Sequence, residues 1–502
     1  MRALCSTALR PVLAILLGLC GLDAVSSEPT HKLEEALSSL FPALPKTSRG
    51  TLRPTTAKYA LQRLFSRLYG WQLGQGAALP VSESSISFGA NVTQWLQAHS
   101  EEGLNLADLA TLAHVLEEMV HEEAEARLVT AFRATGKPTH GLLKLNESTA
   151  ILETYMASFV LGVEIAELHA DSMSELVAEV PEQYPTWPAT QEFLQEVHRA
   201  TVSKTGDISF RDLSRVVSVV DERYGWWQSH ECKALKSELL QIEEHPHTGR
   251  VRLSDFYGRA LKGGQWQFSE STSYLRQMGA LDETDPQSLR VVIPNYMLSL
   301  SNCIAASSYY MVCCINECDL HLDQLEQALG SYQAPAEDIL LALNQSVAPS
   351  LQRRLKDIAE HHSGMVPLHG RLFAQWLHHL HPHDCPYPHM SGTTSPLQPA
   401  VFEEEMGQSA EASQEEMLQH VEAAPWRAPP THEDGMCSHM WSMEEELIDP
   451  AAHVFKDQSQ AFGAQRLAAA LAALCLFSAF STLAKSETGK PRPERSLPVY
   501  SV

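Results

Sequence analysis

The sequence predicts a mainly α-helical protein whose body contains paired helix–loop–helix units and whose chain ends in one transmembrane helix. Three observations support this fold class. Apolar residues recur at helical spacing, as between Leu109 and Val120. Two stretches, Thr205–Asp212 and Thr248–Asp255, share a glycine, alternating apolar residues and a closing acid. An uncharged run extends from Leu467 to Ala484.

Both ends of the chain carry membrane-targeting features. Residues 1–26 combine basic residues, an apolar core from Val12 to Leu22 and a small-x-small site at Ala24–Ser26, which is typical of a secretory signal peptide. The alternative is a short anchor helix, but about eleven apolar residues are too few to span a bilayer. Residues 466–484 have the length of a transmembrane helix, and the alternative is an alanine-rich buried helix. The tail 485–502 is basic and is expected in the cytosol.

These ends predict a type I single-pass protein of the secretory pathway or the cell-surface membrane. The chain has a formal net charge of −24. Nucleic acid is therefore excluded as a partner, because its phosphates require a basic surface. The sequence also lacks the glycine-rich and metalloprotease motifs that would mark a cofactor or catalytic site, so no catalytic or cofactor-binding residue is assigned.

The N-terminal half of the body predicts helices separated by short loops. Residues 27–95 form an N-terminal helical segment with breaks. Residues 96–160 predict a first, eroded pair of helix–loop–helix units. In this pair Leu104 precedes the acid Asp108 at the start of a long helix, and His140–Glu147 repeats the pattern after that helix. A further copy, His362–Gly370, lacks the closing acid, and such internal repetition predicts an array of similar units.

Residues 185–265 predict the better-preserved pair. A glycine, an Ile or Val two residues later (Ile208, Val251) and an acid six residues after the glycine (Asp212, Asp255) resemble the loop of the EF-hand superfamily. The resemblance implies that the glycine makes the sharp turn, that the Ile or Val lies in a short bridge between two loops, and that the acid opens the exiting helix. The spacing of the two glycines predicts that these two loops pair with each other.

The resemblance also implies which residues would hold calcium. In the first loop the coordinating positions fall on hydroxyls, one carbonyl and one acid: Thr201, Ser203, Thr205, Asp207 (through its carbonyl), Ser209 and Asp212. Only Asp212 is a carboxylate at a side-chain position, so this loop is either a weak calcium site, in the range of roughly 10⁻⁴–10⁻³ M, or purely structural. The second loop is expected to be empty, because Pro246 offers no ligand and Arg252 places a cation near the site.

Residues 290–396 predict a Cys/His-rich helical region. Outside the signal and membrane segments the chain has an odd number of cysteines: Cys232, Cys303, Cys313, Cys314, Cys318, Cys385 and Cys437. Their density favours disulfides in an oxidising lumen over a metal site, because a CxxC pair with a matching distal pair is missing. The histidines between His361 and His389 suggest zinc, but their spacing matches no known finger, and a solvated His-rich helix end is the alternative.

Three phrases in this region, Pro367–Trp376, His378–His383 and Cys385–Pro396, resemble an uncharacterised algal and protist family of EF-hand-domain membrane proteins. That family has no assigned activity, so the resemblance implies no catalytic residue. Residues 397–465 are acidic and predict a flexible stalk between the body and the membrane.

Two functions are consistent with these features. The first is a non-enzymatic, membrane-anchored scaffold that binds an unknown protein partner, with weak calcium binding at most. The alternative is a lumenal metalloenzyme or thiol-redox protein that uses the His/Cys region 360–390.

Overall fold

The computed structural model describes residues 27–73, 103–162, 177–181, 184–202, 207–264, 266–305, 307–424 and 440–449. The chain divides into two compact units, Met1–Ile448 and Asp449–Val502. The expected signal peptide (1–26), transmembrane helix (466–484) and tail (485–502) lie outside the described residues. Within the described ranges, no helix is both long enough and apolar enough to cross a membrane.

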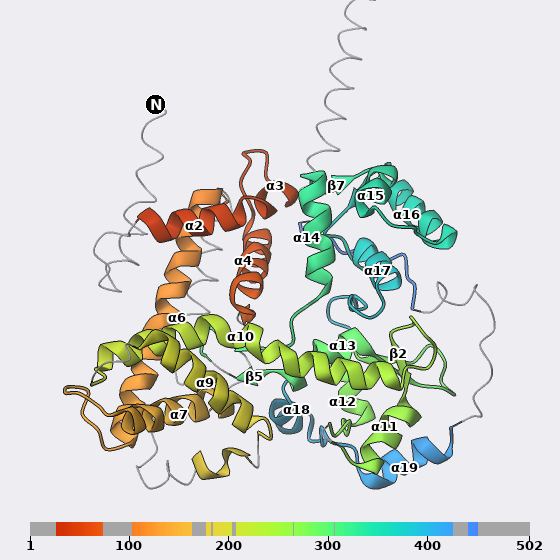
Figure 1. Cartoon of the computed structure of the whole chain (residues 1–502). Helices are drawn as coiled ribbons and strands as arrows, with labels where there is room; N and C mark the ends of the chain where they lie inside the picture. The colour runs from red at the N-terminus through yellow and green to blue at the C-terminus, as the bar shows by residue number, and fades with distance from the viewer. Residues whose placement is uncertain are drawn as a thin grey trace, which may run out of the picture. The chain divides into compact units, whose positions relative to one another are not determined.

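The expected mainly α fold is confirmed (Figure 1). The helices that form the paired units and their flanks are α2 (Ser27–Leu37), α3 (Leu40–Ala43), α4 (Pro54–Tyr69), α6 (Leu106–Ala134), α7 (Leu145–Leu161), α9 (Trp187–Thr201), α10 (Phe210–Gln241), α11 (Leu253–Lys262), α12 (Thr272–Gln277), α13 (Ile293–Met297), α14 (Cys318–Leu329), α15 (Ala336–Leu343), α16 (Pro349–His361), α17 (Arg371–Leu380), α18 (Pro399–Met406) and α19 (Gln414–Glu422). A short 3-10 turn, η2, covers Leu300–Asn302.

The strands are two or three residues long, and most of them join loops. They are β1 (Trp71–Leu73), β2 (Arg250–Arg252), β3 (Leu281–Asp282), β4 (Arg290–Val292), β5 (Ile304–Ala305), β6 (Tyr310–Val312), β7 (Gln333–Ala334) and β8 (Val366–Pro367). They form a sheet in the order β1-β6-β5, a sheet in the order β2-β4-β3 and the two-stranded ladder β7-β8, and all pairings are antiparallel.

Four antiparallel contacts join loops in pairs, each just before a helix. The residues that face each other are Leu52 and Leu104, Leu143 and Ile208, Val251 and Val291, and Ala334 and Val366. All eight bridge residues have buried apolar side chains. Each bridge therefore ties two helix starts together and places one apolar side chain of each loop in a core.

The helix that leaves each loop begins at nearly the same distance from its bridge. Helices α4, α6, α7, α10, α11, α13 and α15 start two residues after the bridge residue, whereas α17 starts at Arg371, five residues after Val366. We number each loop so that its bridge residue is position 8. The loops are then 45–56, 97–108, 136–147, 201–212, 244–255, 284–295, 327–338 and 359–370.

The expected pairing of the loops at 205–212 and 248–255 is wrong. Ile208 faces Leu143, and Val251 faces Val291. Helix α10 connects the two loops without a break over 32 residues, which corresponds to about 48 Å. A bridge between Ile208 and Val251 is therefore excluded, since the loops lie at opposite ends of one unbroken helix.

The eroded pair expected within residues 96–160 is wrong for the same reason. Helix α6 has 29 residues, or about 44 Å, and it separates Leu104 from Leu143. The partner of Leu104 is Leu52, in a loop that the sequence analysis did not identify. Helices α6 and α10 thus each run from a loop of one pair to a loop of the next pair. The two ends of a long helix therefore belong to different pairs.

Three buried clusters form the core of the first unit. The first combines the first two loop pairs and includes Phe65, Tyr155 and Tyr224. The second surrounds the third loop pair and includes Phe256 and Phe402, and the third surrounds the fourth loop pair and includes Trp376.

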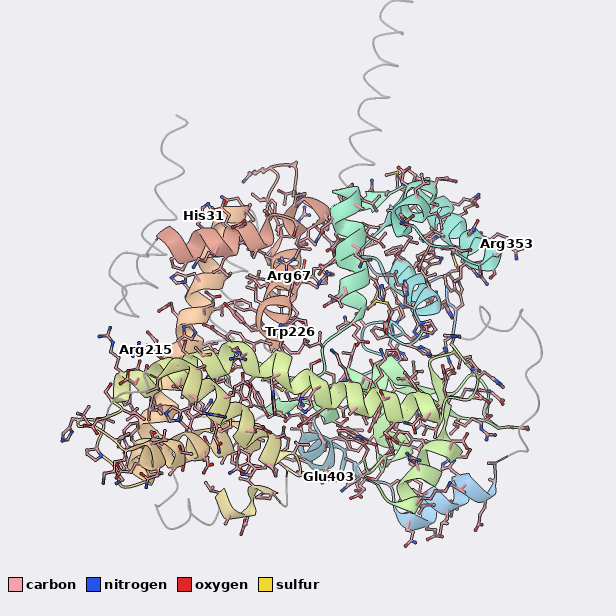
Figure 2. The ribbon with its side chains drawn as sticks, viewed as in Figure 1. His31, Arg67, Arg215, Trp226, Arg353 and Glu403 are labelled. Atoms are coloured by element: carbon pink, nitrogen blue, oxygen red, sulfur yellow. A yellow bond between two sulfur atoms is a disulfide. The ribbon has the colours of Figure 1, made fainter. Side chains whose placement is uncertain are left out.

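Helices α4 and α10 approach each other closely at a pair of glycines. Gly70, the residue directly after α4, lies against Gly225 of α10. A Cβ added to Gly70 would lie only 3.1 Å from the Gly225 Cα. Next to this contact the Trp226 indole N–H donates to the Arg67 carbonyl at 3.1 Å (Figure 2). Larger residues at either glycine would separate the two backbones.

The expected flexible stalk is wrong for much of its length. Residues 399–406 and 414–422 are the helices α18 and α19. Phe402 is buried in the second core, and α19 packs against α11. Residues 440–448 contact the fourth loop pair, as described below. The segment is polar overall, but a few apolar side chains, such as Phe402 and Trp441, pack against the buried clusters.

Candidate functional site

Of the six expected calcium ligands, the described residues bring two, Ser209 and Asp212, into direct contact. Ser203 and Thr205 lie outside the described residues. Thr201 is the last residue of α9, and Asp207 has an exposed side chain. Ser209 and Asp212 are in direct contact at the start of α10.

Asp212 is engaged by its own chain. Its Oδ2 accepts hydrogen bonds from the Ser209 N–H at 2.9 Å and the Ser209 hydroxyl at 2.6 Å, and its other oxygen pairs with Arg215. The Ser209 hydroxyl lowers the pKa of Asp212 below its ordinary value, and the Ser209 backbone and Arg215 lower it further. A calcium ion would have to compete with these contacts for the carboxylate.

The same arrangement recurs in loop 136–147. Glu147 occupies position 12, pairs with Lys137 at position 2 and accepts the Lys144 N–H at 2.9 Å. The hydrogen bond from Lys137 lowers the pKa of Glu147 below its ordinary value. A lysine ammonium of the same loop thus neutralises the acid that a calcium ion would otherwise require.

Loop 244–255 is closed by an arginine. The Arg252 guanidinium, at position 9, binds Asp255 at position 12 through Nε at 2.9 Å and Nη2 at 3.3 Å. Arg252, expected to place a cation near the site, contacts Asp255 directly, so the guanidinium engages the carboxylate that an ion would use. Two parallel bonds make this a strong type of ion pair.

A second acid fills the turn of the same loop. The Glu243 carboxylate accepts the N–H of Thr248 at 2.8 Å and of Gly249 at 2.6 Å, and it contacts His383 Nε2 at 2.8 Å. Gly249 has a φ of 66°, and a Cβ there would lie 2.0 Å from the Pro382 carbonyl. The turn therefore requires glycine, and it is held against the segment after α17.

In loop 359–370 the closing acid comes from elsewhere in the chain. Position 12 is Gly370, which has no side chain, and a Cβ there would lie 3.0 Å from a Glu445 oxygen. Glu445 Oε1 accepts the Leu372 N–H at 3.0 Å, and Oε2 lies 2.6 Å from His362 Nε2. Glu445 thus caps the first turn of α17, where Gly370 has no side chain to do so.

The segment that carries Glu445 is held along its length. Its Leu447 bridges Gly370, and the Glu446 carbonyl accepts the Arg371 N–H at 2.8 Å. The side-chain amide of Gln375 binds the Ser442 backbone at both its N–H, at 3.0 Å, and its carbonyl, at 3.1 Å. Residues 440–448 therefore form an irregular segment that is fixed along the first turns of α17.

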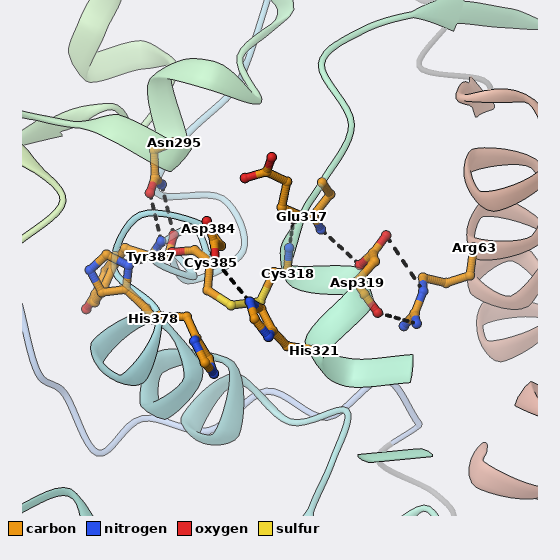
Figure 3. Close-up of a disulfide and its surroundings, with 12 residues drawn as sticks. Arg63, Asn295, Glu317, Cys318, Asp319, His321, His378, Asp384, Cys385 and Tyr387 are labelled. Carbon is orange, nitrogen blue, oxygen red and sulfur yellow. Dashed lines mark hydrogen bonds and ion pairs between the residues drawn. A yellow bond between two sulfur atoms is a disulfide. The ribbon is translucent and has the colours of Figure 1, made fainter. Parts of the chain in front are cut away.

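Six of the expected cysteines form three disulfides: Cys232–Cys314, Cys303–Cys313 and Cys318–Cys385. The expectation of disulfides over a cysteine metal site is thereby supported, and the seventh body cysteine, Cys437, lies outside the described residues. Cys318–Cys385 ties the start of α14 to the segment after α17 (Figure 3). Beside it, Asn295 and the Tyr387 backbone exchange two hydrogen bonds of 2.9 and 2.7 Å.

Most histidines of the expected zinc region contact separate partners. His378 is buried against the Cys385 carbonyl at 2.8 Å, and His389 contacts the Gly279 carbonyl at 2.8 Å. His369 lies 2.8 Å from Glu326. Among the described residues, one group of three potential ligands comes together, and it consists of His321, His381 and Asp384.

A buried charge cluster fixes α4 against α14. The Arg63 guanidinium pairs with Asp323 and with Glu326, the latter at 3.2 Å. It also faces Asp319 (Figure 3), whose Oδ2 lies 3.7 Å from Arg63 Nε. Burial raises the pKa of Asp319 to about 6 even though Arg63 opposes the shift. Removing one partner from such a cluster leaves an uncompensated buried charge, so this contact resists sliding of the two helices.

Sequence reasoning missed several of these residues for identifiable reasons. Loop 284–295 is an offset copy of loop 244–255, with Pro286, Arg290 and Val291 matching Pro246, Arg250 and Val251. It has Leu289 where the other loop has Gly249, so a pattern defined by the turn glycine does not include it. Glu445 gives no sequence signal, because it lies 75 residues beyond Gly370.

Comparison with known protein families, with curated proteins and with solved structures finds no match for this chain.

Proposed function

We propose that the protein is a non-enzymatic scaffold of EF-hand-like pairs that folds and binds its protein partner without calcium. The observation that carries this proposal is that cationic side chains of the chain pair with three of the position-12 carboxylates. Asp212 pairs with Arg215, Glu147 with Lys137 and Asp255 with Arg252. In each of these three pairs a cation of the protein balances the acid that a calcium ion would otherwise balance.

Rigid connections between the units support a structural role. The long helices α6 and α10 continue from one pair to the next, and three disulfides cross-link the body. In calcium sensors, ion binding opens a helix pair and exposes a groove. Here three loop acids pair with Lys or Arg side chains, so we expect these loops to need no ion and the partner to meet one fixed surface.

The compartment is part of the same proposal. Three disulfides favour an oxidising environment, as in the secretory pathway. The apolar runs at 1–26 and 466–484 would direct the chain there and anchor it in the membrane. Asn344 begins an Asn-Gln-Ser sequon and would then accept a glycan on the lumenal side.

Two measurements test the proposal on the full chain. The first is thermal unfolding in detergent with EGTA or with 1 mM calcium, for which we expect the same Tm. A calcium-dependent rise in Tm would show that an ion belongs to the native state. The second is endoglycosidase treatment of membrane fractions, compared with an Asn344→Gln variant. A mobility shift that this variant reduces supports the topology, whereas an untouched Asn344 in the wild type contradicts it.

A further inference from the structure

The three side chains of His321, His381 and Asp384 converge from two parts of the fold. His321 lies on α14, one turn after Cys318, whereas His381 follows α17 and Asp384 precedes Cys385. Their potential ligand atoms all lie within 4.8 Å of one another. The Cys318–Cys385 disulfide joins the two backbones at this place, so the convergence is enforced covalently (Figure 3).

We propose that His321, His381 and Asp384 bind a divalent transition-metal ion, with zinc as the best match to two imidazoles and one carboxylate. This proposal goes beyond the scaffold function and does not depend on it. Zinc sites of three protein ligands leave a fourth position for water. Imidazole nitrogen also selects against calcium and magnesium, which prefer oxygen ligands.

The distances allow such a site with side-chain movement only. Around a tetrahedral zinc with bonds of about 2.0–2.1 Å, ligand atoms lie roughly 3.3 Å apart. His321 Nε2 and Asp384 Oδ2 are already 3.0 Å apart. The rings of His321 and His381 stack with centroids 3.7 Å apart, so they must rotate away from each other for their nitrogens to point at one ion.

The neighbours of Asp384 orient it as the residues around a metal ligand do. Lys236 Nζ donates to Asp384 Oδ1 at 2.7 Å and also pairs with Glu317. Oδ2 therefore remains directed at His321, and such support for a ligating carboxylate is common in metal sites. His321 and Asp384 are 26% and 29% exposed, so an ion can reach them from solvent.

Without a metal, the same atoms form an ordinary ion-pair network from Lys236 through Asp384 to His321. The two interpretations differ in the role of His381. In the network it stacks on His321 and contacts Gln345 Nε2 through its own Nε2 at 3.5 Å, whereas in a metal site it supplies a ligand. Its neighbour His383 contacts Glu243 instead and offers a matched control on the same turn.

The test is zinc binding by the full chain after dialysis against EDTA, measured by metal analysis and by titration with zinc chloride alone. We expect one zinc per chain, with at least tenfold weaker binding in His321→Gln and in His381→Gln and no change in His383→Gln. The visible absorption of cobalt-loaded wild type, lost in His381→Gln, would report direct ligation.

Three outcomes would overturn the proposal: no stoichiometric zinc, equal binding by wild type and His381→Gln, or an equal loss in His383→Gln. Circular dichroism of each variant verifies folding. If His321→Gln unfolds, His381→Gln decides the result alone, because that ring makes no ion pair in the network. Neither result bears on whether calcium affects the Tm, so the metal site and the scaffold function can fail separately.

Discussion

Glu445 supplies a carboxylate to loop 359–370, which has glycine at position 12, and the most informative perturbation is Glu445→Ala. Its carboxylate and the His362 ring are 10% and 13% exposed, so solvent screens their contact weakly. Loss of a helix cap costs about 0.5–2 kcal/mol, and loss of a charge-assisted hydrogen bond costs about 1.5–3 kcal/mol. We expect Glu445→Ala to lower the free energy of unfolding by about 2–3 kcal/mol and to release residues 440–448.

A second substitution makes the test specific. Gly370 has a φ of −100° and a ψ of 153°, a conformation that suits an aspartate cap. In the wild type, Gly370→Asp would crowd Glu445 and Leu447 and place two carboxylates together. In the Glu445→Ala background it would instead restore the acid in its own loop and recover about 1 kcal/mol. The two substitutions should therefore be strongly non-additive.

The assay combines urea unfolding with hydrogen exchange of the amides at 371–376 and 440–448. The matched control is Glu444→Ala, which removes an exposed carboxylate from the adjacent residue. Loss of protection in both segments is expected for Glu445→Ala and not for Glu444→Ala. The reasoning fails if Glu445→Ala behaves like the control, or if Gly370→Asp has the same effect in both backgrounds.

Three further predictions concern stability. Burial raises the pKa of Asp221 to about 7, so folding favours its protonated form, and stability should decline from about pH 4 to pH 7 by up to about 4 kcal/mol through this group. Asp221→Asn should keep an acceptor for the Tyr155 hydroxyl and flatten that decline in urea unfolding; an unchanged slope would contradict the assignment. Arg252→Gln should cost about 0.5–1 kcal/mol, with the same loss in Asp255→Asn and little more in the double variant, whereas additive losses would mean that the two do not act as a pair. Replacing Cys318 and Cys385 by serine opens a closure of 67 residues and should cost about 4 kcal/mol by thermal or urea unfolding, and a loss below about 1 kcal/mol would argue against the cross-link.

The sequence predicts the units better than it predicts their partners. The alternation before Asp108, Glu147, Asp212 and Asp255 marks four helix starts correctly, because capping and bridge burial are local properties. Which loops pair depends on whether the connecting helix is broken. Nothing in α6 or α10 breaks it, and the length of these helices excludes the pairing that the glycine spacing favoured.

Units without a turn glycine were harder to recognise. Leu289 and Tyr332 occupy position 6 in loops 284–295 and 327–338, and neither has a positive φ. These turns are formed differently, for instance by the Asp282 carboxylate, which accepts the Thr284 N–H at 3.0 Å. The bridge residue and the following helix start are the features that all eight loops share, and a search that begins from them would have found both units.

The candidate site was predictable only where its contacts are local. The proximity of Ser209 to Asp212 follows from a spacing of three residues at a helix start. Other contacts join residues far apart in the sequence. Glu445 contacts His362 of loop 359–370 across 83 positions, and His321 contacts Asp384 across 63 positions. A single sequence carries no trace of such contacts.

Calorimetric titration of the full chain with calcium, up to millimolar concentration after removal of metals, tests the central claim most directly. If the loops are closed by Lys137, Arg215 and Arg252, no heat of binding should appear beyond dilution. Stoichiometric binding with an accompanying rise in Tm would contradict the account, because it would mean that calcium displaces the cations that we propose hold the loops closed.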